Sequence, residues 1–186
     1  GVSRDPNRAV ELFKKAAESG DSMGQWMLAH AYKRGTGITT DMNQCIVWMR
    51  VAASCGNRLA QNDLGSFFEN GVGVGKDFKE ATFFYEKSAE QHYPAAIRNL
   101  ARCYEQGIGV NRKLAKAVAL YKQGANYLND DCLESLRRIC KSRFLDDAIN
   151  DNAKACYRLG EDYLVGNGLD NDSSLAEFWL RHSADL

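Results

Sequence analysis

Apolar residues return along this chain in a fixed order every 36 residues. Each period contains a leucine, and an aromatic residue follows it four positions later. The leucines are Leu28, Leu64 and Leu100, and the aromatic residues are Tyr32, Phe68 and Tyr104. Residues four positions apart lie on one face of an α-helix, so the spacing predicts one amphipathic helix in every period.

A second helix is predicted later in each period. Its apolar positions are small alanines and a doublet of large residues, as in Ala81, Phe84-Tyr85 and Ala89. Alanines on a helix face allow a neighbouring helix to approach closely. Each period therefore predicts a pair of helices that pack against each other.

Two glycines, separated by one residue, stand between the two predicted helices. The first of them are Gly35, Gly71 and Gly107, which are 36 residues apart. Glycine adopts the left-handed backbone conformation at low cost and commonly follows the last residue of a helix. The Gly-x-Gly element is therefore predicted to be a short turn between antiparallel helices.

An aspartate stands where the second helix is predicted to begin. Asp5, Asp41 and Asp77 occupy this place, and an aspartate there can accept hydrogen bonds from the first free amides of the helix. Lys113 departs from the pattern in the next period.

These patterns predict an all-α fold, a solenoid of 36-residue helix-turn-helix repeats. The 36-residue period is interrupted after residue 130, because Gly166 lies 59 residues beyond Gly107. Leu136 still keeps the leucine position, but the Gly-x-Gly turn is lost there and a short second helix is expected. We expect one repeat domain, 1–186, made of half a repeat at 1–22, full repeats at 23–58, 59–94 and 95–130, a degenerate repeat at 131–151 and a full repeat at 152–186.

The segment ENGVGVGKDF, residues 69–78, resembles a phosphate-binding loop at first sight. However, Asp77 follows Lys76 where that loop requires Ser or Thr, and Asn70 stands where it requires glycine. A motif that returns every 36 residues also indicates a structural joint of a repeat rather than a single nucleotide site.

Charge and composition argue against several classes of function. The 24 basic residues balance the 24 acidic ones, so the chain lacks the basic excess of a nucleic-acid-binding protein. No apolar run approaches the length of a membrane span, so no membrane insertion is expected. The three histidines fall in different repeats without metal-ligand spacing. We expect no catalytic residues, no metal and no cofactor.

The six cysteines show neither a repeated spacing nor a Cys-x-x-Cys motif. Cys132 and Cys140 lie eight residues apart on one predicted helix, too far for a disulfide. We expect small buried residues with reduced thiols, which favours a reducing compartment and hence the cytoplasm.

Residues 60–89 resemble the Sel-one-like repeat family, a branch of the tetratricopeptide-like helical repeats. The matching positions are Ala60, Leu64, Gly65, Phe68, Gly71, Gly73, Val74, Asp77, Ala81, Phe84-Tyr85 and Ala89. The resemblance covers nearly the whole chain apart from 131–151. It implies a right-handed superhelical α-solenoid that acts as an adaptor between proteins, and its motif carries no catalytic residues.

In such relatives the first helix of each repeat lines the concave side, where partners bind. If the apolar stripe of each first helix faces the core, the opposite face varies from repeat to repeat, as a partner-reading surface would. The same variation is expected of any solvated helix face. The candidate partner-binding residues are Met27, His30, Arg34, Asp63, Ser66, Asn70, Arg98, Asn99, Arg102, Gln106, Arg158 and Glu161.

Two aromatic residues, Trp26 and Phe83, lie on the predicted helices outside the candidate set. Trp26, next to the candidate residues, is expected to pack over the edge of the core rather than to anchor a partner. Phe83 aligns with Val47 and Ala119, and this alignment predicts a core residue.

We therefore expect a non-enzymatic adaptor that binds a protein or peptide in the groove of its first helices. Two alternatives remain open. The ends of the array lack a polar capping helix, which favours a longer natural chain or a self-associating module. The chain could also be an inhibitor or immunity-type protein that occludes a partner enzyme.

Overall fold

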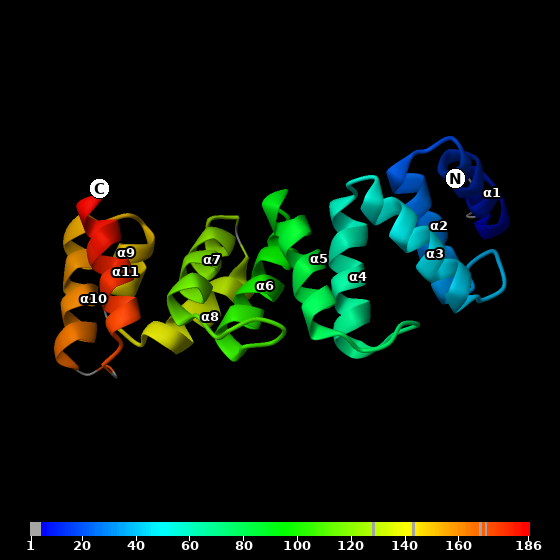
Figure 1. Ribbon diagram of the computed structural model, residues 1–186. Coiled ribbons are helices and arrows are strands. Elements are labelled where there is room, and N and C mark those ends of the chain that lie inside the picture. The colour runs from blue at the N-terminus through cyan, green and yellow to red at the C-terminus, as the bar shows by residue number, and fades with distance from the viewer. Residues whose placement is uncertain (1–4, 128, 143, 168, 170) are drawn as a thin grey trace. The chain divides into compact units, whose positions relative to one another are not determined.

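The computed structural model describes residues 5–127, 129–142, 144–167, 169 and 171–186, and within these ranges it is all-α, without strands (Figure 1). The helices are α1 Pro6–Glu18, α2 Ser22–Arg34, α3 Met42–Ser54, α4 Arg58–Asn70, α5 Phe78–Glu90, α6 Pro94–Gln106, α7 Leu114–Asn126, α8 Asp130–Cys140, α9 Leu145–Ile149, α10 Ala153–Val165 and α11 Ser173–Ala184. The prediction of an all-α helical-repeat fold is confirmed.

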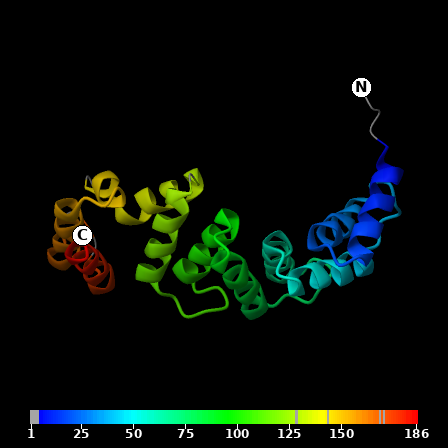
Figure 2. The same cartoon turned by 90° about the horizontal axis from the view of Figure 1, so that it is seen from above.

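The chain forms two compact units, one ending at Ala96 and the other beginning at Ile97, within α6. In unit 1, each of the helices α1 to α4 packs against the next one along the chain. In unit 2, α7 packs against α8, α9 against α10, and α10 against α11, and α7 also contacts α11. The pair formed by α10 and α11 lies side by side in both views (Figure 2).

The glycine turns adopt the predicted backbone. Gly35 and Gly71 end α2 and α4 with φ angles of 69° and 73°. The Gly35 amide donates to the Ala31 carbonyl at 2.9 Å, which satisfies a carbonyl of the last helical turn. Gly107 and Gly166 have φ angles of 74° and 69° after α6 and α10.

Aspartates cap the second helices, as predicted. Asp41 accepts a hydrogen bond from the Gln44 amide at 3.0 Å, and Asp5 and Asp77 each accept two from the start of α1 and α5. Lys113 has the same extended backbone before α7 but makes no side-chain cap hydrogen bond. The free amides at the start of α7 therefore lack the side-chain acceptor that α1, α3, α5 and α11 have.

The core of each repeat forms around the leucine position. These leucines are almost completely buried: Leu28, Leu64, Leu100, Leu136 and Leu159 are exposed by no more than 3%. Gly65 follows Leu64 and lets α5 approach, because a Cβ at Gly65 would lie 2.6 Å from the ring of Tyr85. Close helix contact therefore depends on a missing side chain as well as on apolar ones.

The segment that breaks the repeat rhythm forms α8 and the five-residue helix α9. Lys141 ends α8 with a φ angle of 36°, so a lysine takes the left-handed position that glycine occupies elsewhere. The short second helix expected in this segment is therefore present.

One expectation about the core is wrong. Phe83 is 48% exposed, and Val47, with which it aligns, is 51% exposed. Phe83 lies two residues from both Ala81 and Tyr85, which are buried, and two residues correspond to about 200° around an α-helix. Its side chain is therefore on the side of α5 away from the core.

All six cysteines are free. Five are buried, as expected, but Cys55 is exposed, so the expectation of a buried residue is wrong there. Phe67 is buried as well, with 3% exposure. His92 follows α5 with a φ angle of 56°, in the left-handed region.

Candidate protein-interaction surface

The candidate contact residues lie on α2, α4, α6 and α10, the first helices of the predicted repeats. We call these residues, taken on each unit by itself, the first-helix face. In unit 1 it is contributed by α2 and α4, and in unit 2 by α6 and α10.

A hydrogen-bonded cluster joins α2 to α4. The indole Nε1 of Trp26 donates to Oδ2 of Asp63 at 2.8 Å, and Nε2 of His30 lies 2.9 Å from the same oxygen. The rings of Trp26 and His30 meet edge to face, with centroids 4.5 Å apart. The side chains of His30 and Asp63 are only 18% and 26% exposed. Two of the predicted contact residues are therefore engaged in holding consecutive repeats together.

Trp26 itself is half-buried and packs against the core of unit 1. This agrees with the expectation that it covers the edge of the core. Its polar edge nevertheless has a specific partner in Asp63, as buried tryptophans usually require.

The other candidate residues of unit 1 differ in exposure. Met27 is 37% exposed and Arg34 is exposed at the end of α2. Asn70 donates through Nδ2 to the Ser66 carbonyl at 2.8 Å, within one turn of α4. Met27 and Arg34 are therefore the residues of this part that present an apolar and a basic group to solvent.

In unit 2 four of the candidate residues line one groove. The groove has a volume of about 230 Å³ and lies along α6. The candidate residues in its wall are Arg98, Asn99, Arg102 and Gln106, and the other lining residues are Glu105, Tyr121, Ser135 and Arg138. Side chains that sequence analysis placed on one helix face thus meet residues of α7 and α8.

Charge in this groove is organised around Glu105. Arg138 approaches it in a two-pronged arrangement, with Nη1 at 2.7 Å from Oε1 and Nη2 at 3.0 Å from Oε2. The Tyr121 hydroxyl donates to Oε2 at 2.8 Å. Burial by itself favours the neutral acid, but the hydrogen bonds from Arg138 and Tyr121 outweigh it, so the pKa of Glu105 is lowered. The carboxylate is therefore a fixed negative charge between arginines.

A second ion pair lies at the other end of the groove, between Arg98 and Asp131 of α8. With Glu105–Arg138, it connects α6 to α8 at two points. Arg102 stands between these pairs along α6 and is half-buried. Three arginines and one carboxylate, that of Glu105, line the groove. Even with Asp131, which pairs with Arg98, these side chains carry a net positive charge.

The remaining candidates, Arg158 and Glu161, are exposed on α10 and do not line this groove. The guanidinium of Arg158 lies 5.4 Å from the ring centroid of Phe144. The Glu161 carboxylate accepts a hydrogen bond from Tyr157 and raises the pKa of that phenol.

Sequence analysis missed Glu105, Tyr121, Ser135 and Arg138. The last two belong to the segment where the repeat is degenerate, so no aligned column predicted their orientation. One signal was present: Glu105 and Arg138 have opposite charges and are separated by nearly one repeat, like His30 and Asp63.

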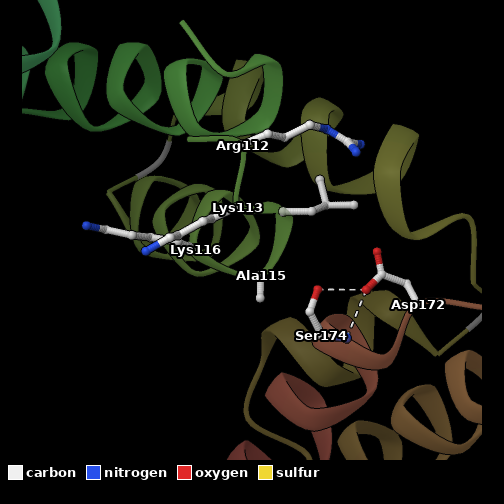
Figure 3. A pocket seen from close by; sticks show the side chains of 7 residues that line it. Arg112, Lys113, Ala115, Lys116, Asp172 and Ser174 are labelled. Atoms are coloured by element: carbon white, nitrogen blue, oxygen red, sulfur yellow. Dashed lines mark hydrogen bonds between the residues drawn. The ribbon is translucent and has the colours of Figure 1, made fainter. Parts of the chain in front are cut away.

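A further groove of about 530 Å³ in unit 2 lies at the start of α7 (Figure 3). Asp172 accepts a hydrogen bond from the Ser174 hydroxyl at 2.7 Å on one side of it. Lys113 and Lys116 point to the opposite side, away from Asp172 and Arg112 (Figure 3). Nζ of Lys116 donates to the Tyr104 hydroxyl at 2.7 Å. The basic groups of this groove therefore do not converge on one ligand position.

The described part of the chain was not predicted to hold a metal or to cross a membrane. No group of three or more His, Cys, Asp or Glu residues is arranged there to hold a metal ion. None of the helices described is long and apolar enough to cross a membrane.

Stacked helix pairs joined by glycine turns, with polar contacts between successive first helices, define a helical-repeat scaffold. The Sel1 repeat model matches residues 1–21, 22–57, 58–93, 94–126 and 153–186. The chain belongs to the Sel1 repeat family, whose members are generally scaffolds for protein interaction and typically not catalytic.

Solved structures agree with this assignment. A Sel1 repeat protein from Oxalobacter formigenes is 30% identical, with a TM-score of 0.72 over 100% of this chain and 81% of that chain. The protein c5321, a protective antigen of uropathogenic Escherichia coli strains with an SLR fold, is 28% identical, with a TM-score of 0.69. The similarity covers 95% of this chain and 40% of c5321, so this chain spans less than half of that antigen.

Cysteine rich protein B of Helicobacter pylori is 21% identical, with a TM-score of 0.58 over 73% of this chain and 98% of that chain. At this identity the likeness concerns the fold alone. No curated protein matches the chain in sequence.

Proposed function

We propose that the chain is a non-enzymatic adaptor that binds a protein or peptide through its first-helix face. The observation that carries the proposal is the groove of about 230 Å³ along α6, to which four candidate contact residues contribute. Binding energy at protein interfaces is concentrated in a few residues, among which arginine is enriched. This groove is rich in arginine, since its lining includes Arg98, Arg102 and Arg138.

The unit 1 part of the first-helix face contributes differently. His30 and Asp63 fix the relative position of α2 and α4, and Met27 and Arg34 offer the contact groups. A pre-organised surface binds with a smaller entropic cost than a flexible one. The hydrogen bonds of Asp63 thus favour binding because they keep α2 and α4 in a fixed relative position.

The charge of the first-helix face indicates which kind of partner it attracts. Arg34 and Arg102 are both basic, and the groove along α6 has a net positive charge. A partner segment with carboxylates meets these groups with complementary charge, which favours fast and specific association.

Affinity capture from lysate, with the bound proteins identified by mass spectrometry, tests this proposal. The test variant is Arg34→Glu/Arg102→Glu, and the matched control is Lys15→Glu/Lys79→Glu, which makes the same charge change at residues of α1 and α5. A protein captured by the wild type and by the control but lost from the test variant supports the first-helix face. Equal capture by both variants, with intact helicity, argues against it.

Self-association is the main alternative function. It predicts that the captured protein is the chain itself and that light scattering shows a mass that rises with concentration. An inhibitor function predicts instead that every partner captured is an enzyme and loses activity in the complex.

A further inference from the structure

A second groove, in unit 1, is formed by residues other than those of the first-helix face. It has a volume of about 480 Å³ and is formed by α3, the start of α4 and α5. Its lining residues include Arg50, Ala53, Gln61, Phe83, Phe84 and Lys87. A volume of roughly 300 to 1,000 Å³ is typical of sites that enclose a small ligand or a few side chains of a partner.

The wall of this groove is aromatic. Phe84 is half-buried, and its ring stacks on that of Phe68 with centroids 5.7 Å apart. Phe83 meets Phe84 edge to face at 5.3 Å, yet it remains 48% exposed. A large aromatic side chain held in a fixed orientation at the edge of a hollow is typical of an interface anchor.

The floor of the groove is already satisfied in hydrogen bonding. Gln61 is 7% exposed, and its Nε2 donates to the Ala53 carbonyl at 3.1 Å. Its Oε1 accepts from Nε2 of Gln91 at 2.7 Å. The floor therefore requires no polar group from a ligand, and the surface that gains from being covered is the apolar surface of Phe83, Phe84 and Ala53.

The rim of the groove is basic. Its two charged lining residues are Arg50, whose guanidinium lies 5.3 Å from the Phe68 ring centroid, and Lys87, whose Nζ lies 5.9 Å from that of Phe83. Lys87 also contacts Glu90 at 3.2 Å, and both side chains are about half exposed, at 46% and 57%. An exposed pair of this kind is weak, so Lys87 can contact another carboxylate with little loss.

We propose that this groove binds an acidic segment of another protein, which places an aliphatic side chain against Phe83 and Ala53 and its carboxylates beside Arg50 and Lys87. The apolar walls select the aliphatic side chain, and the two cations select flanking Glu or Asp residues by charge complementarity. This surface goes beyond the proposed function, because it is formed by other residues than the first-helix face. The chain would then contact two partners, or two segments of one partner.

The proposal is tested with purified protein and a synthetic probe. The probe is a fluorescein-labelled peptide of four Glu-Leu-Glu-Glu units, and binding is followed by fluorescence anisotropy. Two control peptides carry the same label, one with lysine in place of every glutamate and one with serine in place of every leucine. We expect the first peptide to bind, with an affinity that falls as salt rises, and both controls to bind at least about tenfold more weakly.

Substitutions in the groove test whether the probe binds there. Phe83→Ala and the double variant Arg50→Ser/Lys87→Ser should each weaken binding by about tenfold or more. Phe78→Ala is the matched control, because Phe78 is 42% exposed on the same helix but does not line the groove. Lys79→Ser serves as the control for charge, and circular dichroism verifies that each variant is folded.

Three results would overturn the proposal. The first is no binding of the acidic peptide to the wild type, and the second is equal binding to wild type and Phe83→Ala. The third is a dimer in light scattering that Phe83→Ala abolishes, because the groove would then be covered by a second copy of the chain. If Phe83→Ala leaves binding unchanged, loss of binding in Arg34→Glu/Arg102→Glu would place the acidic probe on the first-helix face instead, so this proposal and the first-helix face can fail separately.

Discussion

The indole of Trp26 and the imidazole of His30 share one carboxylate oxygen of Asp63, at 2.8 and 2.9 Å. Trp26 and His30 are on α2 and Asp63 is on α4, so one acidic residue joins two consecutive repeats. Repeat proteins are stabilised by the interfaces between neighbouring repeats. This contact is therefore expected to control how strongly unit 1 holds together.

Replacing Asp63 by alanine should destabilise the protein by about 1 to 3 kcal/mol, because the Trp26 and His30 nitrogens lose their partner in a half-buried site. The free energy of unfolding in urea measures this effect. A double-mutant cycle of Asp63→Ala with Trp26→Phe should give a coupling energy of at least about 0.5 kcal/mol. Additive effects of the two substitutions would show that the shared oxygen is not a stabilising contact.

Lys113→Asp should raise the stability of the protein by about 0.5 to 1 kcal/mol. Lys113 has a φ of −142° and a ψ of 91°, close to the −145° and 107° of Asp77, whose carboxylate caps α5. An aspartate at 113 can therefore cap α7 without a change of backbone. The melting temperature reports the gain, and Lys113→Ala controls for the loss of the positive charge. A melting temperature equal to that of the alanine variant would mean that no cap forms.

Gly65→Ala should destabilise unit 1 by about 1 to 3 kcal/mol, since the added Cβ would lie 2.6 Å from the Tyr85 ring. Tyr85 is 1% exposed and its hydroxyl donates to Glu69 at 2.8 Å, so the ring has little room to move. Gly75→Ala is the matched control, because no atom lies within 4 Å of its added Cβ. Urea unfolding of both variants measures the contrast, and equal stability would contradict the close approach of α4 and α5.

A thiol-specific reagent at pH 8 should modify one cysteine quickly and five slowly. Cys55 is the exposed thiol, and the others are buried. Burial raises the pKa of Cys140 to about 11, so its reactive thiolate is scarce at that pH. In denaturant all six should react at similar rates. Rapid reaction of a second cysteine without denaturant would show that unit 1 or unit 2 opens easily.

Glu105 should make the stability of unit 2 depend on pH in the acid range. Its pKa in the folded protein is lowered, so its contribution is fully present above the unfolded pKa of about 4.3 and is lost as the pH falls through the folded value. The free energy of unfolding should therefore fall less between about pH 5 and pH 3 in Glu105→Gln than in the wild type. Glu134→Gln, an exposed residue of α8, serves as the control. Parallel profiles for wild type and Glu105→Gln would contradict the role given to Arg138 and Tyr121.

The repeated features of the fold were predictable from sequence because each occurs several times. The leucine position, the glycine turns and the aspartate caps each satisfy a local physical requirement, so comparison of Leu64 with Leu28 is enough to place them. Phe83 shows the limit of this reasoning. Its aligned residues are apolar, but the burial of an apolar residue depends on the direction in which it faces, and Phe83 faces away from Ala81 and Tyr85.

The contacts that shape the candidate surface were harder to predict. Side chains that join repeats, such as Trp26 with Asp63 and Glu105 with Arg138, occur once each and follow no repeating column. Their pairing depends on the offset between successive helices, which the period alone does not define. Sequence therefore predicted which helix face is variable, but not which of its residues bind their own neighbours.

The most direct test of the adaptor function is a calorimetric titration of the captured partner against three proteins: wild type, Arg34→Glu/Arg102→Glu and Lys15→Glu/Lys79→Glu. The first-helix face predicts that the first variant binds at least about tenfold more weakly than wild type and that the second binds as the wild type does. Equal affinities for all three proteins would contradict a partner site on this face.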